Sequence, residues 1–376
     1  MKLTKPYHLK DYKFNLVVLV IAISIIGVLA VGSAQKSAQP KQIFGVILGI
    51  IVMVIVSLID YNWILKFYWV MYVVNLILLI AVRFVGVSVN GAKRWLDLGF
   101  TRIQPSDLTK LLMILFFAQF LMKREEVFKN CKGLLNKTLW EGVALILPSL
   151  VLIYLQPNLS NTICLAALFC ALLYLGGLHY RFIGTVLVIV IPISVIFLSI
   201  VVQPDQKLIK PYQQKRILAW LHPDEYRDGT GYQQSNSIMA IGSGQLTGKG
   251  LDNNTTTSVK NGNFISEPQT DFIFAIIGEE LGFVGCCIVI ILLLLIVVEC
   301  ILIGLRAQNL AGMIICGGVA SLIGIQTFIN ISVATGIFPN TGLSLPFISY
   351  GLSSLICLYM GIGFVLNVGL QPKKYQ

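Results

Sequence analysis

Charged side chains are scarce in this sequence. Of its 376 residues, 12% are charged, 17 are acidic and three are histidine, whereas 56% are hydrophobic. So little polar surface cannot cover a soluble globule of this size, which indicates that a lipid bilayer is the solvent. The three histidines are scattered, and seven of the eight cysteines fall inside apolar runs. Neither pattern suits a metal site or a disulfide framework.

Long apolar runs take the place of charge. Runs such as Phe14 to Val31, Ile43 to Leu58 and Trp63 to Val85 have the roughly 20 residues that a spanning helix needs. They are continuous rather than alternating, which predicts helices and not barrel strands. We therefore expect an all-α, polytopic integral membrane protein with about ten transmembrane helices, forming one domain over residues 1–376. The further spans are expected near 108–122, 140–155, 162–177, 182–202, 272–303, 310–331 and 345–370.

The lysines and arginines predict the orientation of the chain. The N-terminal lysines, the basic loop 123–137, Arg181, Arg306 and the C-terminal lysines fall on one side of ten spans. That side is the cytoplasm, so both termini are expected there, with the first helix uncleaved. The net charge of +11 forms no patch interleaved with aromatic residues. We therefore expect membrane lipid, and no nucleic acid, as a partner.

The opposite side is expected to collect the polar segments. They are residues 86–104, 156–161, 203–270 and 332–344. The segment 203–270, between helices 7 and 8, is a large extracytoplasmic loop, far longer than an ordinary connection. Within it, Tyr212 to Trp220 is typical of an amphipathic helix lying on the membrane surface. No internal repeat is visible, so the inverted halves of secondary transporters have no support.

Three acidic residues stand where this long loop enters an apolar helix: Asp271, Glu279 and Glu280. Ionisable groups at membrane depth are costly, so each needs a partner or a role. Asp271 is also a good N-cap for the following helix, and capping leaves room for a second role. For Glu279 and Glu280, structural pairing with basic side chains between helices is the simpler interpretation.

Three cations lie on the same side of the membrane. Lys93 and Arg94 precede the fourth span, and Lys110 lies in its second turn. Lys110 either reaches outward to water, pairs with Asp107, or joins Lys93 and Arg94 in an outward-facing anion site suited to phosphate. The segment Ile241 to Gly250 looks like a phosphate loop. However, Ser243 and Gly250 break the pattern at its first glycine and at its magnesium-binding hydroxyl.

Nine short motifs run in order through most of the chain and resemble the SEDS family (shape, elongation, division and sporulation) of bacterial cell-wall polymerases, which includes RodA, FtsW and SpoVE. The motifs are Asn90-Gly-Ala-Lys-Arg-Trp95, Gln104-Pro-Ser-Asp107 with Lys110, Gln156-Pro-Asn-Leu159, Gly231-Tyr-Gln-Gln-Ser235, Ala240-Ile-Gly-Ser-Gly244, Gly248-Lys-Gly250, Thr270-Asp-Phe-Ile-Phe274, Gly278-Glu-Glu-Leu-Gly282 and Gly342-Leu-Ser-Leu-Pro-Phe-Ile-Ser-Tyr-Gly351. Three positions depart from the family pattern: Asp107 replaces a more common Glu, Asn158 a common Asp, and Leu352 a glycine. The order and topology of the motifs together carry the resemblance.

The resemblance implies a peptidoglycan glycosyltransferase that polymerises lipid II at the outer face of the bacterial cytoplasmic membrane. The family's catalytic aspartate corresponds to Asp271, and its functional Arg and Lys correspond to Arg94 and Lys110. We expect Lys93, Trp95, Glu279 and Glu280 to complete the substrate-binding site. The resemblance also implies a class B penicillin-binding transpeptidase as partner. The short N-terminus and the short tail after Leu370 slightly favour the elongation branch, RodA, over division or sporulation.

This inventory of residues suits glycosyl transfer from a pyrophosphate. Pyrophosphate is a good leaving group, so one base and some positive charge suffice, whereas an ordinary glycoside needs two carboxyl groups. Asp271 is the candidate base, and Arg94 and Lys110 are the candidates to stabilise the leaving charge. No dedicated cofactor site is evident and no metal ligands are assigned. A divalent cation, Mg²⁺ or Mn²⁺, stays open as a helper.

Two other functions remain open on the sequence. A flippase would move the lipid-linked precursor across the membrane, but the polar residues gather on one face and mid-membrane charges are few. A membrane scaffold for other wall-synthesis enzymes would explain the large outer loop. It would not explain why Arg94, Lys110 and Asp271 should be ionisable.

Overall fold

The structure is a computed structural model. It describes residues 11–89, 92–97, 99, 102–126, 137–178, 198–203, 211–223, 225–226, 231–252 and 268–371, with isolated positions 184, 188, 192 and 196. Most of the span expected at 182–202 lies outside these residues. The predicted number of ten spans therefore stays a prediction.

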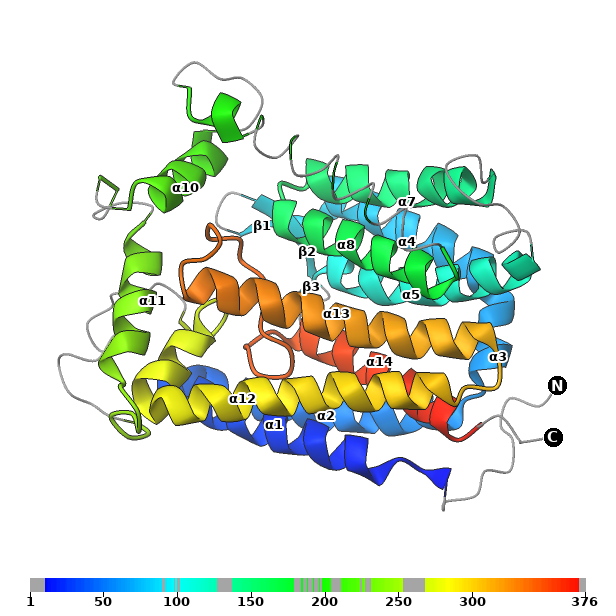
Figure 1. Ribbon diagram of the computed structural model, residues 1–376, viewed down its shortest axis with the longest axis horizontal. Helices are drawn as coiled ribbons and strands as arrows, with labels where there is room; N and C mark the ends of the chain where they lie inside the picture. The colour runs from blue at the N-terminus through cyan, green and yellow to red at the C-terminus, as the bar shows by residue number, and fades with distance from the viewer. Residues whose placement is uncertain are drawn as a thin grey trace.

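The described residues form a helical bundle (Figure 1). Eight of its helices are long and apolar enough to cross a membrane, and α8 is a shorter apolar helix of 17 residues. The helices of the bundle are α1 (Phe14–Ala34), α2 (Gln39–Leu58), α3 (Tyr61–Ile64), α4 (Tyr68–Val85), α5 (Pro105–Lys123), α7 (Lys137–Leu155), α8 (Leu159–Leu175), α12 (Ile273–Leu305), α13 (Leu310–Ala334) and α14 (Leu352–Gly369). The predicted all-α membrane fold is confirmed.

Burial separates the central helices from the peripheral ones. In α5, 78% of the apolar segment is buried, and α14 and α13 follow at 72% and 61%. By contrast, α2 and α4 bury 28% and expose large side chains such as Phe44 and Ile77. Apolar side chains that face outward in such numbers require lipid around the bundle. The central helices therefore supply the interior in which a polar site can be fixed.

One end of the bundle carries a small sheet and two further helices. A small antiparallel sheet of β1 (Val87–Val89), β2 (Ala92–Asp97) and β3 (Arg102–Ile103) precedes α5. Two further helices, α10 (Pro211–Leu221) and α11 (Tyr232–Ser243), lie beyond the same end (Figure 1). The helix predicted at 212–220 is confirmed as α10, and the indole N–H of Trp220 donates to the carbonyl oxygen of Gly336 at 3.0 Å. We call this end of the bundle the polar end.

Helix α12 bends at Gly282, where φ is 65° and ψ is −164°. The segment after α11 pairs with the bend through its backbone: the N–H groups of Lys249 and Gly250 donate to the carbonyls of Glu279 and Glu280, both at 3.0 Å. A Cβ at Gly248 would overlap the carbonyl of Glu280. The glycine-rich stretch that resembles a phosphate loop therefore supports α12 through direct contact between the two backbones. We call residues 244–250 the brace on α12.

Candidate functional site

Lys110 is buried in the first half of α5, with 2% of its side chain exposed. Its ammonium donates to Asp107 Oδ1 at 2.8 Å and to Asn161 Oδ1 at 3.0 Å. The interpretation that Lys110 reaches outward to water is therefore wrong, and the predicted pairing with Asp107 is confirmed. A buried ammonium held by one carboxylate and one amide is a fixed positive charge at the polar end of the bundle.

Ser106 joins this ion pair to three neighbouring amides. Its hydroxyl accepts from the side chains of Gln104 at 3.0 Å, Asn161 at 3.1 Å and Asn158 at 3.4 Å. Asn158 also caps α8, because its Oδ1 accepts from the backbone N–H of Asn161. The network fixes the start of α5 against the start of α8. It holds Lys110 in one position.

Arg94 lies on β2 and reaches the turn that ends α7. Its Nε donates to the carbonyl oxygen of Gln156 at 3.2 Å, and its Nη2 donates to that of Pro157. Its neighbour Lys93 is exposed, and Trp95 is half-buried. Arg94 and Lys110 therefore approach the same turn, residues 156–161, from two sides, whereas Lys93 stands apart in water.

Asp271 stands just before α12. The helix starts at Ile273 with Phe272 as its N-cap, so the interpretation of Asp271 as the N-cap is wrong. The amide of Asn330 on α13 donates to the backbone carbonyl of Asp271 at 2.9 Å and to that of Leu343. A Cβ at Gly342 would lie 3.1 Å from Asp271 Oδ2. The carboxylate therefore lies against the loop between α13 and α14.

That loop connects Asp271 with the cationic side of the site. The hydroxyl of Ser160, beside Asn161, donates to the carbonyl oxygen of Thr341, next to Gly342. At the other end of the loop, Ser353 accepts from the backbone N–H of Gln104 at 3.1 Å. Asp271, Arg94 and Lys110 come from segments far apart in sequence, yet all border the 156–161 turn or the loop that it contacts.

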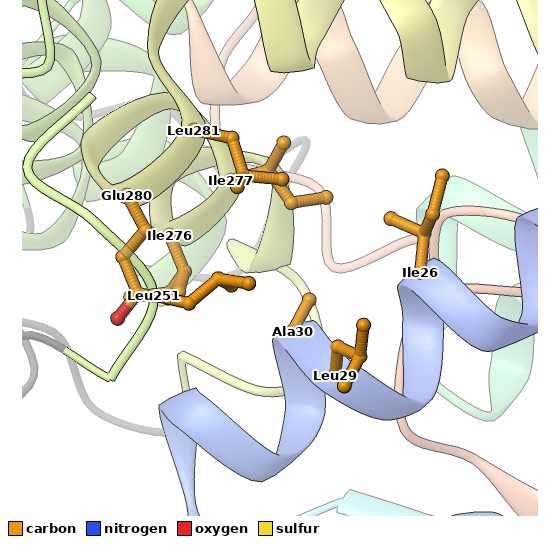
Figure 2. Close-up of a pocket in the computed structure, with 8 residues that line it drawn as sticks. All are labelled: Ile26, Leu29, Ala30, Leu251, Ile276, Ile277, Glu280 and Leu281. Atoms are coloured by element: carbon orange, nitrogen blue, oxygen red, sulfur yellow. The ribbon is translucent and has the colours of Figure 1, made fainter. Parts of the chain in front are cut away.

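Glu279 and Glu280 are buried beside the brace on α12. Glu279 Oε1 lies 2.9 Å from the ammonium of Lys249, and Glu280 accepts from the hydroxyl of Ser33. Glu280 also borders a cavity of about 50 Å³ between α1 and α12, lined otherwise by apolar side chains (Figure 2). This volume is far below the roughly 300 Å³ at which ligand pockets begin. The contact with Lys249 matches the pairing interpretation for Glu279, although this lysine lies in the segment after α11 and not on a helix, whereas the partner of Glu280 seen here is a serine hydroxyl. A role of the two glutamates in substrate binding stays a prediction.

Three polar residues of the site carry few signals in the sequence. Ser106 and Asn161 lie in or beside quoted motifs, but only the fold reveals that they meet around Lys110. Asn330 lies in an apolar run 59 residues from Asp271, and nothing in its local sequence points to that contact. Among the described residues, no three His, Cys, Asp or Glu side chains come together, so they offer no ready cage for a divalent cation.

These features define a multi-pass α-helical membrane protein with a fixed polar site at one end of its bundle. The FtsW, RodA and SpoVE family of cell cycle proteins matches residues 9–374. The chain belongs to this family.

Curated relatives and solved structures agree with this assignment. The peptidoglycan glycosyltransferase MrdB of Escherichia coli is 34% identical over 368 residues, covering 96% of this chain and 94% of MrdB. The probable peptidoglycan glycosyltransferase FtsW of Coxiella burnetii is 36% identical over 304 residues, covering 80% and 77%. A chain from a solved peptidoglycan synthase complex has a TM-score of 0.79 and is 29% identical, covering 95% of this chain and 97% of that one. Thermus thermophilus RodA, a rod shape determining protein, has a TM-score of 0.67 and is 26% identical, covering 95% and 96%.

Proposed function

We propose that this protein is a peptidoglycan glycosyltransferase of the bacterial cytoplasmic membrane that polymerises lipid II into glycan strands. The observation that carries the proposal is the convergence of one carboxylate and two cations on adjoining segments at the polar end of the bundle. The relatives named as peptidoglycan glycosyltransferases support it. In this proposal the polar end faces outward and both termini lie in the cytoplasm, as the distribution of Lys and Arg predicts.

In the proposed reaction, a hydroxyl of the acceptor sugar attacks the anomeric carbon of the donor. The new bond joins that oxygen to the anomeric carbon, while the bond from this carbon to the pyrophosphate oxygen breaks. Asp271 takes the proton of the hydroxyl as general base. Arg94 and Lys110 stabilise the negative charge of the departing pyrophosphate. The polyprenyl chain of the substrate stays in the bilayer throughout.

The geometry gives each cation a different part. Lys110 is fixed by Asp107 and Asn161, so its charge needs no reorganisation when the pyrophosphate leaves. Arg94 donates through Nε and Nη2 to the carbonyls of Gln156 and Pro157, which fixes its planar guanidinium beside the 156–161 turn, and a guanidinium suits phosphate oxygens as a ligand. Lys93 and Trp95 stand beside Arg94 on β2 and complete the substrate-binding surface in this proposal. A class B penicillin-binding transpeptidase is the proposed partner, in line with the match to a peptidoglycan synthase complex.

The test is polymerisation of purified lipid II by the detergent-solubilised protein, alone and with its transpeptidase partner. We expect glycan chains from the wild type, and a loss of at least about 100-fold in rate for Asp271→Asn. The variant has to keep the melting temperature of the wild type for the comparison to hold. If neither the wild type nor Asp271→Asn makes glycan chains, although both are folded and the transpeptidase partner is present, the proposal is contradicted. That outcome would favour a flippase or a scaffold.

A further inference from the structure

Helix α13 carries two buried amide side chains at the level of the polar end. Gln326 and Asn330 are each 1% exposed, and their spacing of four residues places them on one face of the helix. Val319 and Ile323 precede them on the same face by helical geometry. A Cβ at Gly361 of α14 would lie 3.4 Å from Val319 and 3.7 Å from Leu111 of α5. This face of α13 therefore points into the bundle, toward α5 and α14.

The depth of Gln326 follows from these contacts. Leu111 and Val319 lie at one level, because both flank Gly361. Seven residues, about 10 Å, further toward the polar end bring α13 to Gln326 and α5 to its first turn. That turn carries Ser106 and Asp107 of the Lys110 network. Asn330 lies one turn further outward and holds the backbone of Asp271. Along the bundle axis, Gln326 is therefore level with the start of the Lys110 network and one turn inside the residue that holds Asp271.

The hydrogen bonds of the two amides are incomplete. Among the described residues, Gln326 Oε1 and Asn330 Oδ1 are buried without a donor, although the other end of Asn330 donates to two carbonyls. A buried acceptor left in this state costs about 1–3 kcal/mol. Both oxygens can be satisfied only by a group that donates. A pyrophosphate presents acceptors, so it does not match them, whereas a sugar hydroxyl or an acetamido N–H does.

We propose that Gln326 is a substrate-binding residue that accepts a hydrogen bond from a hydroxyl or acetamido N–H of the sugar in lipid II. The inference rests on the proposed function, and it gives the site two chemically distinct halves. Arg94 and Lys110 hold the pyrophosphate, whereas Gln326 binds the sugar by a hydrogen bond. Asn330 is a positioning residue, because it holds the backbone of Asp271 against the loop that follows α13.

The test compares two ligands with one variant. Gln326→Leu removes the amide and keeps a similar volume, and Gln326→Met serves if the leucine variant folds poorly. The matched control is Asn75→Leu, because Asn75 is also a 1% exposed amide in a spanning helix but donates to Ser149 on α7. The ligands are lipid II and undecaprenyl pyrophosphate, which lacks the sugars. Binding is measured as the rise in melting temperature of the detergent-solubilised protein with ligand concentration.

We expect Gln326→Leu to weaken lipid II binding about tenfold and to leave binding of undecaprenyl pyrophosphate within twofold of the wild type. Its melting temperature without ligand should equal or exceed that of the wild type, because an unsatisfied buried acceptor is gone. Asn75→Leu should bind both ligands normally. Equal lipid II binding by wild type and Gln326→Leu, or an equal loss for both ligands, would overturn the inference.

The binding measurement separates this inference from the proposed function. If the wild type binds lipid II without polymerising it, the proposed function fails and the role of Gln326 is still decided by the variant. If the wild type binds neither ligand, the sugar-binding role of Gln326 is overturned together with the proposed function.

Discussion

The side-chain ammonium of Lys249 lies 2.9 Å from Glu279 Oε1, and the backbone N–H of the same lysine donates to the carbonyl of the same glutamate at 3.0 Å. Two residues 30 positions apart are thus joined through both side chain and backbone. Because 2% of the Glu279 side chain is exposed, this lysine compensates a carboxylate that water scarcely reaches. The pair fastens the segment after α11 to the helix that follows Asp271.

We expect Lys249→Met to lower the free energy of unfolding by about 1–3 kcal/mol, because it leaves a carboxylate buried beside an apolar side chain. Lys249→Met combined with Glu279→Met should recover most of that loss. Melting temperatures in detergent check both. The control is Lys36→Met, since the Lys36–Asp252 pair is largely exposed and should contribute little. A double variant no more stable than the single one would contradict the prediction, and polymerisation by the double variant tests whether Glu279 also binds substrate.

Stability and activity should separate at the buried pair of α5. Lys110→Met leaves the Asp107 carboxylate buried without its cation, so we expect the free energy of unfolding to fall by about 3–5 kcal/mol. Lys110→Met with Asp107→Leu should melt close to the wild type, because both charges are gone, yet polymerise lipid II at least about 100-fold more slowly. Recovery of both properties together would show that Lys110 is structural and remove it from the catalytic proposal.

Arg94 and its neighbour Lys93 provide a matched pair of cations. Arg94→Lys replaces the planar guanidinium, whose two N–H groups donate to the carbonyls of Gln156 and Pro157, by a single ammonium. We therefore expect kcat/KM for lipid II to fall at least about tenfold. Lys93→Ala removes a solvent-exposed charge of the proposed substrate-binding surface and should lower kcat/KM by only about threefold, a loss that shrinks as salt rises. Steady-state polymerisation at two ionic strengths measures both. An equal loss for the two variants would assign the effect to net charge rather than to the guanidinium geometry of Arg94.

Gly342 has a φ of +75°, and a Cβ there would lie 3.1 Å from Asp271 Oδ2. We expect Gly342→Ala to slow polymerisation at least about tenfold, because the methyl group displaces the carboxylate of the candidate base. Gly336→Ala is the control in the same loop, since its φ is +82° and its Cβ would meet the end of the Ile238 side chain. Both variants should lose stability through backbone strain, by about 1–2 kcal/mol. Similar activity of the two at similar stability would contradict the prediction.

Periodic and compositional features could be predicted from the sequence. The apolar runs predict the helices, because spanning a bilayer fixes both their length and their polarity. The ends of the helices differ from the prediction where a loop has tertiary partners. The last span is expected from residue 345, but α14 starts at Leu352, because the preceding loop bonds to the carbonyls of Thr270 and Gln269. The small sheet before α5 lies in a segment predicted only as a polar loop.

The site could be predicted in part. Asp271, Arg94 and Lys110 stand out because charge is rare in an apolar chain. Gln326 and Asn330 do not, because a neutral amide in an apolar run has no distinctive pattern until the fold shows which face is buried. The pairing of Lys110 with Asp107 could be predicted from their spacing, but its second partner, Asn161, is set by the approach of α8 to α5, a contact between residues 51 positions apart.

The brace on α12 has a consequence for how this chain tolerates mutation. Side chains at Gly244 and Gly248 would overlap main-chain carbonyl groups of Gly278 and Glu280, which every amino acid carries. No second mutation across the contact can therefore make room, whereas a crowded pair of side chains could be relieved by shrinking one of them. The run of glycines that imitates a nucleotide-binding loop thus has a plain cause: two stretches of main chain touch, and neither position can accept a substitute.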